Sequence, residues 1–401
     1  MKFKPLVFAL AFIFTTILSC QKNNHPFPNS DLSKIDSTSM ELVWEKPLDS
    51  NFQYISIFPF PVDENIIHTY DFGLNQILIY RDGKTGEEIK RINFNGILYP
   101  TNGAVINDKL VIGDIKDVTV LEPKTSVTRY VYYITNQSAY LNERFKTFGD
   151  FVITNEYSFL PQDSMDRIIA INVKDNTSRI LYNEKNNQGK NLLGKSLLWI
   201  DETGDTILTV NKAYQSGIAA PSNLMSFNIS KNTLLYDKRF SAIYQGRDFI
   251  SFNKKLYFVT ANNTIMCVNG KTGNTLWEFN HNGDKSIRTL DMNLIDNQLV
   301  IVSGYYKANL LSLDPESGKL LWANNDIDYF HDYTKFLLIE NIIYFGKDDY
   351  IYGFDKNTGV LLKKQRITNL KNHLISNLSY SEKNKLIYAI NSSFIKALKI
   401  K

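Results

Sequence analysis

Cysteine is scarce in this chain of 401 residues, which contains only Cys20 and Cys267. No internal disulfide is available if Cys20 carries a lipid, so the fold must then be held together by packing alone. Cys267 lies inside an apolar run, and we expect it to be a small core residue rather than a reactive thiol.

Clustered charge and metal-ligand patterns are also missing. The chain has 45 Lys and Arg against 41 Asp and Glu, and these are scattered along its length. Because nucleic-acid binding needs a basic stripe, we exclude nucleic acid as a partner. The five histidines share no metal-ligand spacing, and no acidic run fits a calcium-binding loop. We therefore expect no metal site, and the sequence identifies no catalytic residue.

The first twenty residues have the order of a targeting segment. Lys2 and Lys4 precede an uncharged apolar run, Leu6 to Leu18, which is too short for a permanent transmembrane helix. The run ends in Ile17-Leu18-Ser19-Cys20, which resembles a bacterial lipobox. We therefore expect residues 1–20 to be a lipoprotein signal peptide with Cys20 as the lipid (palmitate) attachment site. The alternative is an ordinary signal peptide with a chance cysteine.

Residues 21–40 are rich in Asn, Pro, Ser and Asp, and they predict a flexible tether.

Aromatic residues, in contrast, are abundant, and the 23 Tyr and 25 Phe favour strands. One unit recurs along the chain: an apolar strand, a small-apolar-Asx triplet, a polar turn and another strand. Clear copies have turns that end at Gly86, Gly273, Gly318 and Gly359, and degenerate copies end at Ser126, Thr177 and Thr233. Because Gly takes positive φ at low cost and Asx bonds the turn backbone, the unit predicts a structural hairpin.

The spacing of these turns suits one four-stranded propeller blade per repeat. After the seventh turn only three more strands follow, within residues 378–400. A fourth is available at the other end of the chain, where Leu42-Val43-Trp44-Glu45 matches Thr275-Leu276-Trp277-Glu278. We therefore predict a single all-β, eight-bladed β-propeller over residues 41–401, in which residues 41–48 complete the last blade beside residues 392–401. Seven blades is the alternative.

The triplet, the turn, its Gly and the Leu-Trp pair resemble the repeat of pyrroloquinoline-quinone-like (PQQ-like) β-propellers. The resemblance extends over nearly the whole chain from residue 41. It implies that a Trp of the outer strand packs over the turn of the neighbouring blade. The blade-docking residues expected on this ground are Trp44, Trp277 and Trp322, with Gly273, Gly318 and Gly359. Trp199 lies in an inner strand, and no docking role is expected for it.

The family contains quinoprotein dehydrogenases and non-catalytic members such as the BamB lipoproteins, scaffolds in the machinery that inserts outer-membrane β-barrels. The dehydrogenases use an adjacent Cys pair, a Trp beneath the cofactor, and Glu, Asn and Asp ligands for calcium; this chain has no Cys pair. The resemblance thus implies a membrane-anchored, non-catalytic scaffold in the bacterial cell envelope, most consistent with the outer membrane. It implies no cofactor, and envelope or outer-membrane proteins as partners. The alternatives are a quinoprotein-type oxidoreductase and a small-ligand or glycan-binding propeller that uses the central channel.

Residues 189–196 match the spacing of a phosphate-binding loop, but polar residues precede them and a β-hairpin pattern follows. A real loop of that kind joins a buried strand to a helix, so we exclude nucleotide as a ligand.

Two repeats are longer than the others, with the extra residues between their second and third strands, at Tyr157–Arg167 and Lys212–Asn223. These loops would lie on adjacent blades and carry Tyr157, Phe159 and Tyr214 as partner-binding residues. The alternative is that they merely cover the face of the propeller.

Overall fold

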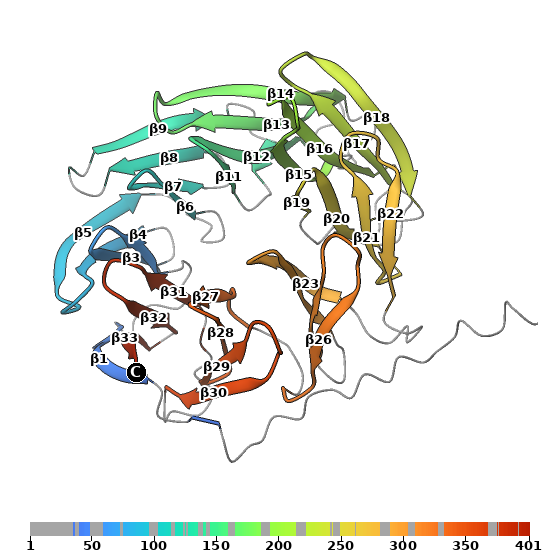
Figure 1. Ribbon diagram of the computed structural model, residues 1–401. Coiled ribbons are helices and arrows are strands. Elements are labelled where there is room, and N and C mark those ends of the chain that lie inside the picture. Colours follow the sequence, from blue (N-terminus) through green and yellow to red (C-terminus); the bar gives the residue numbers. More distant parts are fainter. Residues whose placement is uncertain are drawn as a thin grey trace, which may run out of the picture.

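The computed structural model describes residues 35–36, 40–48, 59–72, 75–95, 103–113, 117–122, 125, 127–134, 139–141, 145–158, 165–185, 193–213, 222–240, 243, 249–260, 262–280, 289–303, 309–327, 333–367, 375, 377–391 and 393–401. Eight antiparallel sheets stand in a ring, one per blade (Figure 1). The predicted all-β propeller of eight blades is confirmed, and the seven-bladed alternative is wrong.

The strands of blades one to four follow one another along the chain, and the first strand of each blade lies nearest the centre (Figure 1). They are β2 (Phe60–Val62), β3 (Asn65–Phe72), β4 (Asn75–Asp82) and β5 (Glu88–Asn95) in blade one; β6 (Gly103–Ile106), β7 (Lys109–Gly113), β8 (Asp117–Glu122) and β9 (Val127–Tyr133) in blade two; β10 (Ala139–Leu141), β11 (Lys146–Phe148), β12 (Phe151–Ser158), β13 (Met165–Asn172) and β14 (Thr177–Lys185) in blade three; and β15 (Leu193–Ile200), β16 (Thr206–Ala213), β17 (Ser222–Asn228) and β18 (Thr233–Phe240) in blade four. Blade three has five strands because β10 and β11 both pair with β12.

Blades five to eight have the same order, and blade eight takes its outer strand from the N-terminal part of the chain. The strands are β19 (Ile250–Phe252), β20 (Lys255–Val259), β21 (Ile265–Asn269) and β22 (Thr275–Phe279) in blade five; β23 (Thr289–Ile295), β24 (Gln298–Ser303), β25 (Asn309–Leu313) and β26 (Leu320–Asn324) in blade six; β27 (Leu337–Ile339), β28 (Ile342–Lys347), β29 (Tyr350–Asp355) and β30 (Leu361–Arg366) in blade seven; and β31 (Asn377–Ser381), β32 (Leu386–Ile390), β33 (Phe394–Ile400) and β1 (Met40–Pro47) in blade eight.

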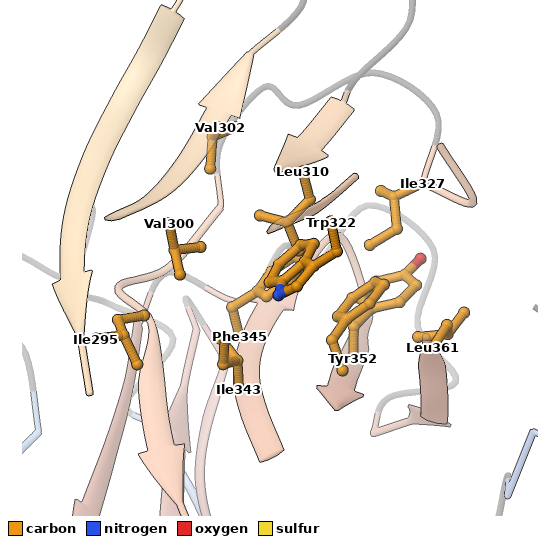
Figure 2. Close-up of a cluster of buried hydrophobic side chains, with 11 residues drawn as sticks. Ile295, Val300, Val302, Leu310, Trp322, Ile327, Ile343, Phe345, Tyr352 and Leu361 are labelled. Carbon is orange, nitrogen blue, oxygen red and sulfur yellow. The ribbon is translucent and has the colours of Figure 1, made fainter. Parts of the chain in front are cut away.

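The hydrophobic pattern follows from the face-to-face packing of the blades. The two middle strands of a blade are covered on both faces, so they are continuous apolar runs such as Leu256–Val259 and Ile265–Val268, all buried. The outer strand is only partly covered, and β22 is largely exposed. Between blades six and seven, the core includes Leu310, Trp322 and Tyr352 (Figure 2).

Two kinds of tight turn lie on one side of the ring, which we name the turn rim. In blades two, five and six, the first and second strands are joined by two-residue turns with positive φ at both residues, such as Asn253 and Lys254. Third and fourth strands are joined by Asx turns; Asp355 Oδ1, for example, accepts bonds from the N–H groups of Asn357 and Thr358 at 3.0 and 2.8 Å. The second-to-third hairpins and the blade-to-blade connections lie on the opposite side, the connection rim.

The ring is closed by the two ends of the chain, as predicted. β1 pairs antiparallel with β33, from Met40 opposite Ile400 to Pro47 opposite Phe394. Within the segment expected to be a tether, residues 21–40, Asp36 forms a parallel bridge with Lys363 in β30, so the chain contacts the ring before β1.

Candidate functional site

Each outer strand contains one β-bulge: at its second or third residue in blades one and four to seven, at its fifth in blades two and three, and at the fourth residue of β1 in blade eight, which no turn precedes. One residue of the outer strand is left out of the ladder, and the next residue re-joins it. The residues left out are all aliphatic: Val43, Ile89, Val131, Leu181, Leu235, Leu276, Leu321 and Leu362. The residue after each is named here the docking residue. These are Trp44, Lys90, Tyr132, Tyr182, Tyr236, Trp277, Trp322 and Lys363.

Three docking residues are Trp, and each lies on the turn of the next blade. Trp277 donates from Nε1 to Pro315 O at 3.1 Å, Trp322 to Lys356 O at 2.7 Å, and Trp44 to Gly83 O at 2.9 Å. Their rings cover the glycines that end these turns: Trp277 lies over Gly318, Trp322 over Gly359 and Trp44 over Gly86. A Cβ at any of the three glycines would overlap the indole, so each turn needs Gly both for its positive φ and for this close approach.

The remaining glycine of the expected set, Gly273, is covered by Tyr236 rather than by a Trp. Tyr236 is the docking residue of blade four, and its ring lies where a Gly273 Cβ would be 2.8 Å away. Trp199, for which no docking role was expected, also contacts the next blade. Its ring lies against Gly270, and its Nε1 donates to Thr209 within its own sheet at 3.0 Å. That expectation was wrong, because the inner strand β15 reaches the same turn from the other side.

The partner-binding hypothesis fails for Tyr157, which is not on an exposed loop. It lies in β12, is 3% exposed, and donates its hydroxyl hydrogen to Leu193 O at 2.6 Å. The extra residues of blades three and four lengthen the strands, so that β12, β13 and β16 have eight residues each where β20 has five. The other two predicted residues, Phe159 and Tyr214, lie outside the described residues.

At the connection rim, these long strands hold buried charge. Glu156 is 2% exposed, and it binds Arg167 of β13 and the hydroxyl of Tyr132, the docking residue of blade two. Burial and the Glu156 carboxylate raise the pKa of Tyr132 well above its ordinary value, so its hydroxyl remains a donor. The carboxylate therefore joins blade two to blade three and fixes the start of the β12–β13 hairpin.

The seam between blades three and four is also polar near this rim. Asn155, fully buried, donates to Gly194 O at 2.8 Å and accepts from Ser196 Oγ at 3.2 Å. Lys212 of β16 pairs with Glu184 of β14. Side chains thus fix the two long hairpins to each other.

Sequence reasoning missed Tyr133, which follows the docking residue Tyr132 and ends β9. Its side chain is 64% exposed, the highest value among the large hydrophobic and aromatic side chains that stand exposed in the described part of the chain. The repeat pattern does not mark it, because the bulge of β9 comes three residues later in its strand than that of β22, so Tyr132 does not take the place of Trp277. Tyr133 follows Tyr132, whose hydroxyl binds Glu156 of blade three.

The residues present do not fit the cofactor site of quinoprotein dehydrogenases. Cys267, in β21, is fully buried, and burial raises the pKa of its thiol to about 12. Trp199 packs on a turn of the next blade. Within the described residues, no group of three or more His, Cys, Asp or Glu could hold a metal ion. In that same part of the chain, no helix is long and apolar enough to cross a membrane.

Residues 203–325 match the family model described as outer membrane protein assembly factor BamB. This segment contains the two Leu-Trp copies of the repeat, at Trp277 and Trp322. In this segment the chain is similar to the PQQ-like repeat, and the whole chain has the β-propeller fold.

Solved structures with a similar fold come from several functional classes. BamB from Moraxella catarrhalis has 14% identity and a TM-score of 0.59, over 90% of this chain and 100% of that one. A quinohemoprotein alcohol dehydrogenase from Pseudomonas putida has 10% identity and a TM-score of 0.61, over 93% and 78%. The C-terminal WD40 domain of Sif2 has 12% identity and a TM-score of 0.59, over 90% and 98%. Among curated proteins, none matches the sequence. At these identities the likeness shows the fold alone.

Proposed function

We propose that this PQQ-like propeller is a non-catalytic scaffold of the bacterial envelope, anchored by a lipid on Cys20, that binds outer-membrane assembly proteins. The match of residues 203–325 to the outer-membrane assembly factor model is the observation that carries the proposal. The lipobox-like order of residues 1–20 supports an envelope location.

The partner-binding site in this proposal is the connection rim of blades two to four. Protein interfaces depend on a few anchors, mostly aromatic residues and Arg, presented on a surface that does not have to be ordered on binding. Tyr133 is an exposed aromatic, and its neighbour Tyr132 binds Glu156, which also holds the half-buried Arg167. The ion pairs Arg167–Glu156 and Lys212–Glu184 hold the hairpins in place before a partner arrives. Phe159 and Tyr214 remain part of the proposed site.

Site-specific photocrosslinking in growing cells tests the site. We expect a photoreactive residue at Tyr133 to form adducts with outer-membrane assembly proteins. The control is the same residue at Ile89, which is 54% exposed on the outer strand of blade one and lies outside the proposed site. Equal adducts from both positions, or none from Tyr133, would remove this rim from the proposal.

The anchor is tested separately by Cys20→Ala. We expect this variant to leave the membrane fraction and to lose fatty-acid labelling, while the folded ring is unchanged. Membrane association equal to that of the wild type would contradict the lipid anchor.

The proposal assigns no cofactor, and the quinoprotein alternative is supported only by likeness of fold. Titration of the purified protein with pyrroloquinoline quinone and calcium is expected to give no saturable binding and no dye-linked alcohol or sugar oxidation. A stoichiometric complex would favour the quinoprotein oxidoreductase over the non-catalytic scaffold.

A further inference from the structure

The chain joins the ring at the outer edge of blade seven. Asp36 donates its N–H to Leu362 O at 3.0 Å and accepts from the N–H of Lys364 at 3.2 Å. Ile35 packs against the core cluster of Figure 2. A little further on, the side-chain amide of Gln365 accepts from Met40 N at 2.6 Å and donates to Met40 O at 2.8 Å. The first described residues, Ile35 and Asp36, therefore lie at the circumference of the ring, on β30.

Exposed aliphatic side chains surround this point. Leu362 of β30 is 36% exposed, and Leu42 and Val43 of β1 are 50% and 43% exposed. Among the outer-strand side chains that the structure describes, β1 is alone in exposing two large aliphatic residues. The bulge causes this, because it leaves Val43 out of the ladder next to Leu42.

The same surface carries several lysines. Lys363 in β30 and the exposed Lys399 and Lys401 at the end of β33 form no ion pair with any described residue. The acids near them are Asp36, which bridges to Lys363, Glu41, opposite Lys399 in the ladder, and Glu45, which pairs with Lys396 at 3.2 Å. An aliphatic patch edged by lysines has the chemistry of a surface that rests on phospholipid headgroups.

We propose that the outer circumference of blades seven and eight docks on a bilayer that contains anionic phospholipid. This rests on the proposed lipid anchor at Cys20. Fourteen residues, 21–34, separate Cys20 from Ile35, and they span at most about 50 Å when fully extended. Such a short connection keeps the patch at a high effective concentration next to the bilayer, so a weak contact is enough.

The docked orientation has a consequence for the partner. In a ring of eight blades, the seam between blades three and four lies opposite the seam between blades seven and eight. The connection rim of blades three and four is then a ring diameter away from the bilayer. The partner would be bound through a soluble part that stands clear of the membrane.

Depth-dependent fluorescence quenching tests the docking on the lipidated full-length protein in vesicles with anionic phospholipid. A fluorophore is attached in separate variants at Val43→Cys and at Leu276→Cys. Leu276 is a matched control, because it occupies the same bulge position in blade five with 46% exposure. Cys267 does not compete for the label, since it is fully buried and its thiol pKa is raised to about 12.

We expect quenchers at headgroup depth to reduce the emission at position 43 at least two-fold more than at position 276. Lys363→Gln, Lys399→Gln and Lys401→Gln together should reduce that difference. Equal quenching at both positions, with the protein still on the vesicles, would overturn the docking and leave the anchor in place. Protein that does not stay on the vesicles would overturn both proposals.

Discussion

The two seams beside blade eight are closed in different ways. Between blades eight and one, Trp44 lies over Gly86 and donates to Gly83 O. Between blades seven and eight, the docking residue is Lys363, and there is no turn to receive it, because β33 and β1 belong to opposite ends of the chain. There the segment at Asp36 pairs with β30, and Gln365 binds the backbone of Met40.

The comparison shows that the aromatic residue and the glycine turn belong to one contact shared by two blades. The four third-to-fourth turns that end in Gly at positive φ in the described part of the chain receive an aromatic ring from the preceding blade: Gly86 from Trp44, Gly273 from Tyr236, Gly318 from Trp277 and Gly359 from Trp322. Lys90 precedes a blade whose turn ends at Ser126, and Lys363 precedes blade eight, which has no such turn. The turns that end in Gly are thus the ones covered by Trp in three seams and by Tyr in one.

The largest effect is expected from removing the strand that both seams share. Deletion of residues 40–47 takes away β1 and Trp44, and it exposes the edge of β33. The loss should be on the order of the whole stability of a domain, about 5–15 kcal/mol, so we expect aggregation or no cooperative melting transition. Circular dichroism measures the melting transition, and size-exclusion chromatography measures aggregation. Deletion of residues 21–34 is the control and should change neither. If the two deletions fold equally well, the shared blade is not required for closure.

The next largest effect comes from Gly→Ala substitutions, which compare a turn glycine under an indole ring with one in open space. Gly318 (φ +69°) lies under Trp277, where a Cβ would be 2.6 Å from Cδ2, whereas Gly204 (φ +82°) has nothing within 4 Å. Gly204→Ala should cost only the positive-φ strain, about 1 kcal/mol. Gly318→Ala adds the overlap with the indole and should cost about 3 kcal/mol. Urea unfolding of both variants measures the difference, and equal costs would mean that the indole moves aside freely.

The sequence was sufficient for the fold because its strongest signals are local. The match of Leu42-Val43-Trp44-Glu45 to Thr275-Leu276-Trp277-Glu278, for example, predicted the pairing of β1 with β33 that closes the ring. The site was harder, because its polar residues have partners far along the chain. Asn155 and Glu156 look like loop residues in the sequence, yet they are buried because Gly194 O and Arg167 bind them. Only the folded ring brings those partners together, so Tyr157 was placed on a loop that is a strand.

Acid should weaken the seam between blades eight and one more than the other Trp seams. Arg81 donates from Nε to His68 Nε2 at 3.0 Å and from Nη1 to Gly86 O at 3.0 Å, directly below Trp44. Burial, with the charges of Arg81 and Arg91, lowers the pKa of His68 from 6.5 to about 3. The unfolded chain takes up a proton near pH 6.5, and the folded protein does so only near pH 3. The free energy of unfolding should therefore fall across this window as the pH drops, by about 2 kcal/mol between pH 7 and pH 5.

His68→Gln provides the control, since an amide oxygen accepts from Arg81 but does not titrate. Urea unfolding at several pH values should give a flatter pH dependence for this variant than for the wild type. Parallel curves would mean that other groups cause the acid sensitivity.

The smallest effect distinguishes the seams in which one carbonyl has two side-chain donors from the seam with one. Pro315 O accepts from both Trp277 Nε1 and Tyr257 Oη, each at 3.1 Å, and Gly83 O accepts in the same way from Trp44 and Tyr388. Between blades six and seven, Trp322 is the donor to Lys356 O, and Val300 stands at the position of Tyr257.

Tyr257→Phe alone should cost only about 0.5 kcal/mol, because Trp277 still binds the buried carbonyl. In a Trp277→Phe background the same change leaves that carbonyl without either donor, and it should cost about 1–2 kcal/mol. A double-mutant cycle by urea unfolding measures the coupling. Strict additivity would mean that water replaces the lost donor, and that the second hydroxyl adds nothing to the seam.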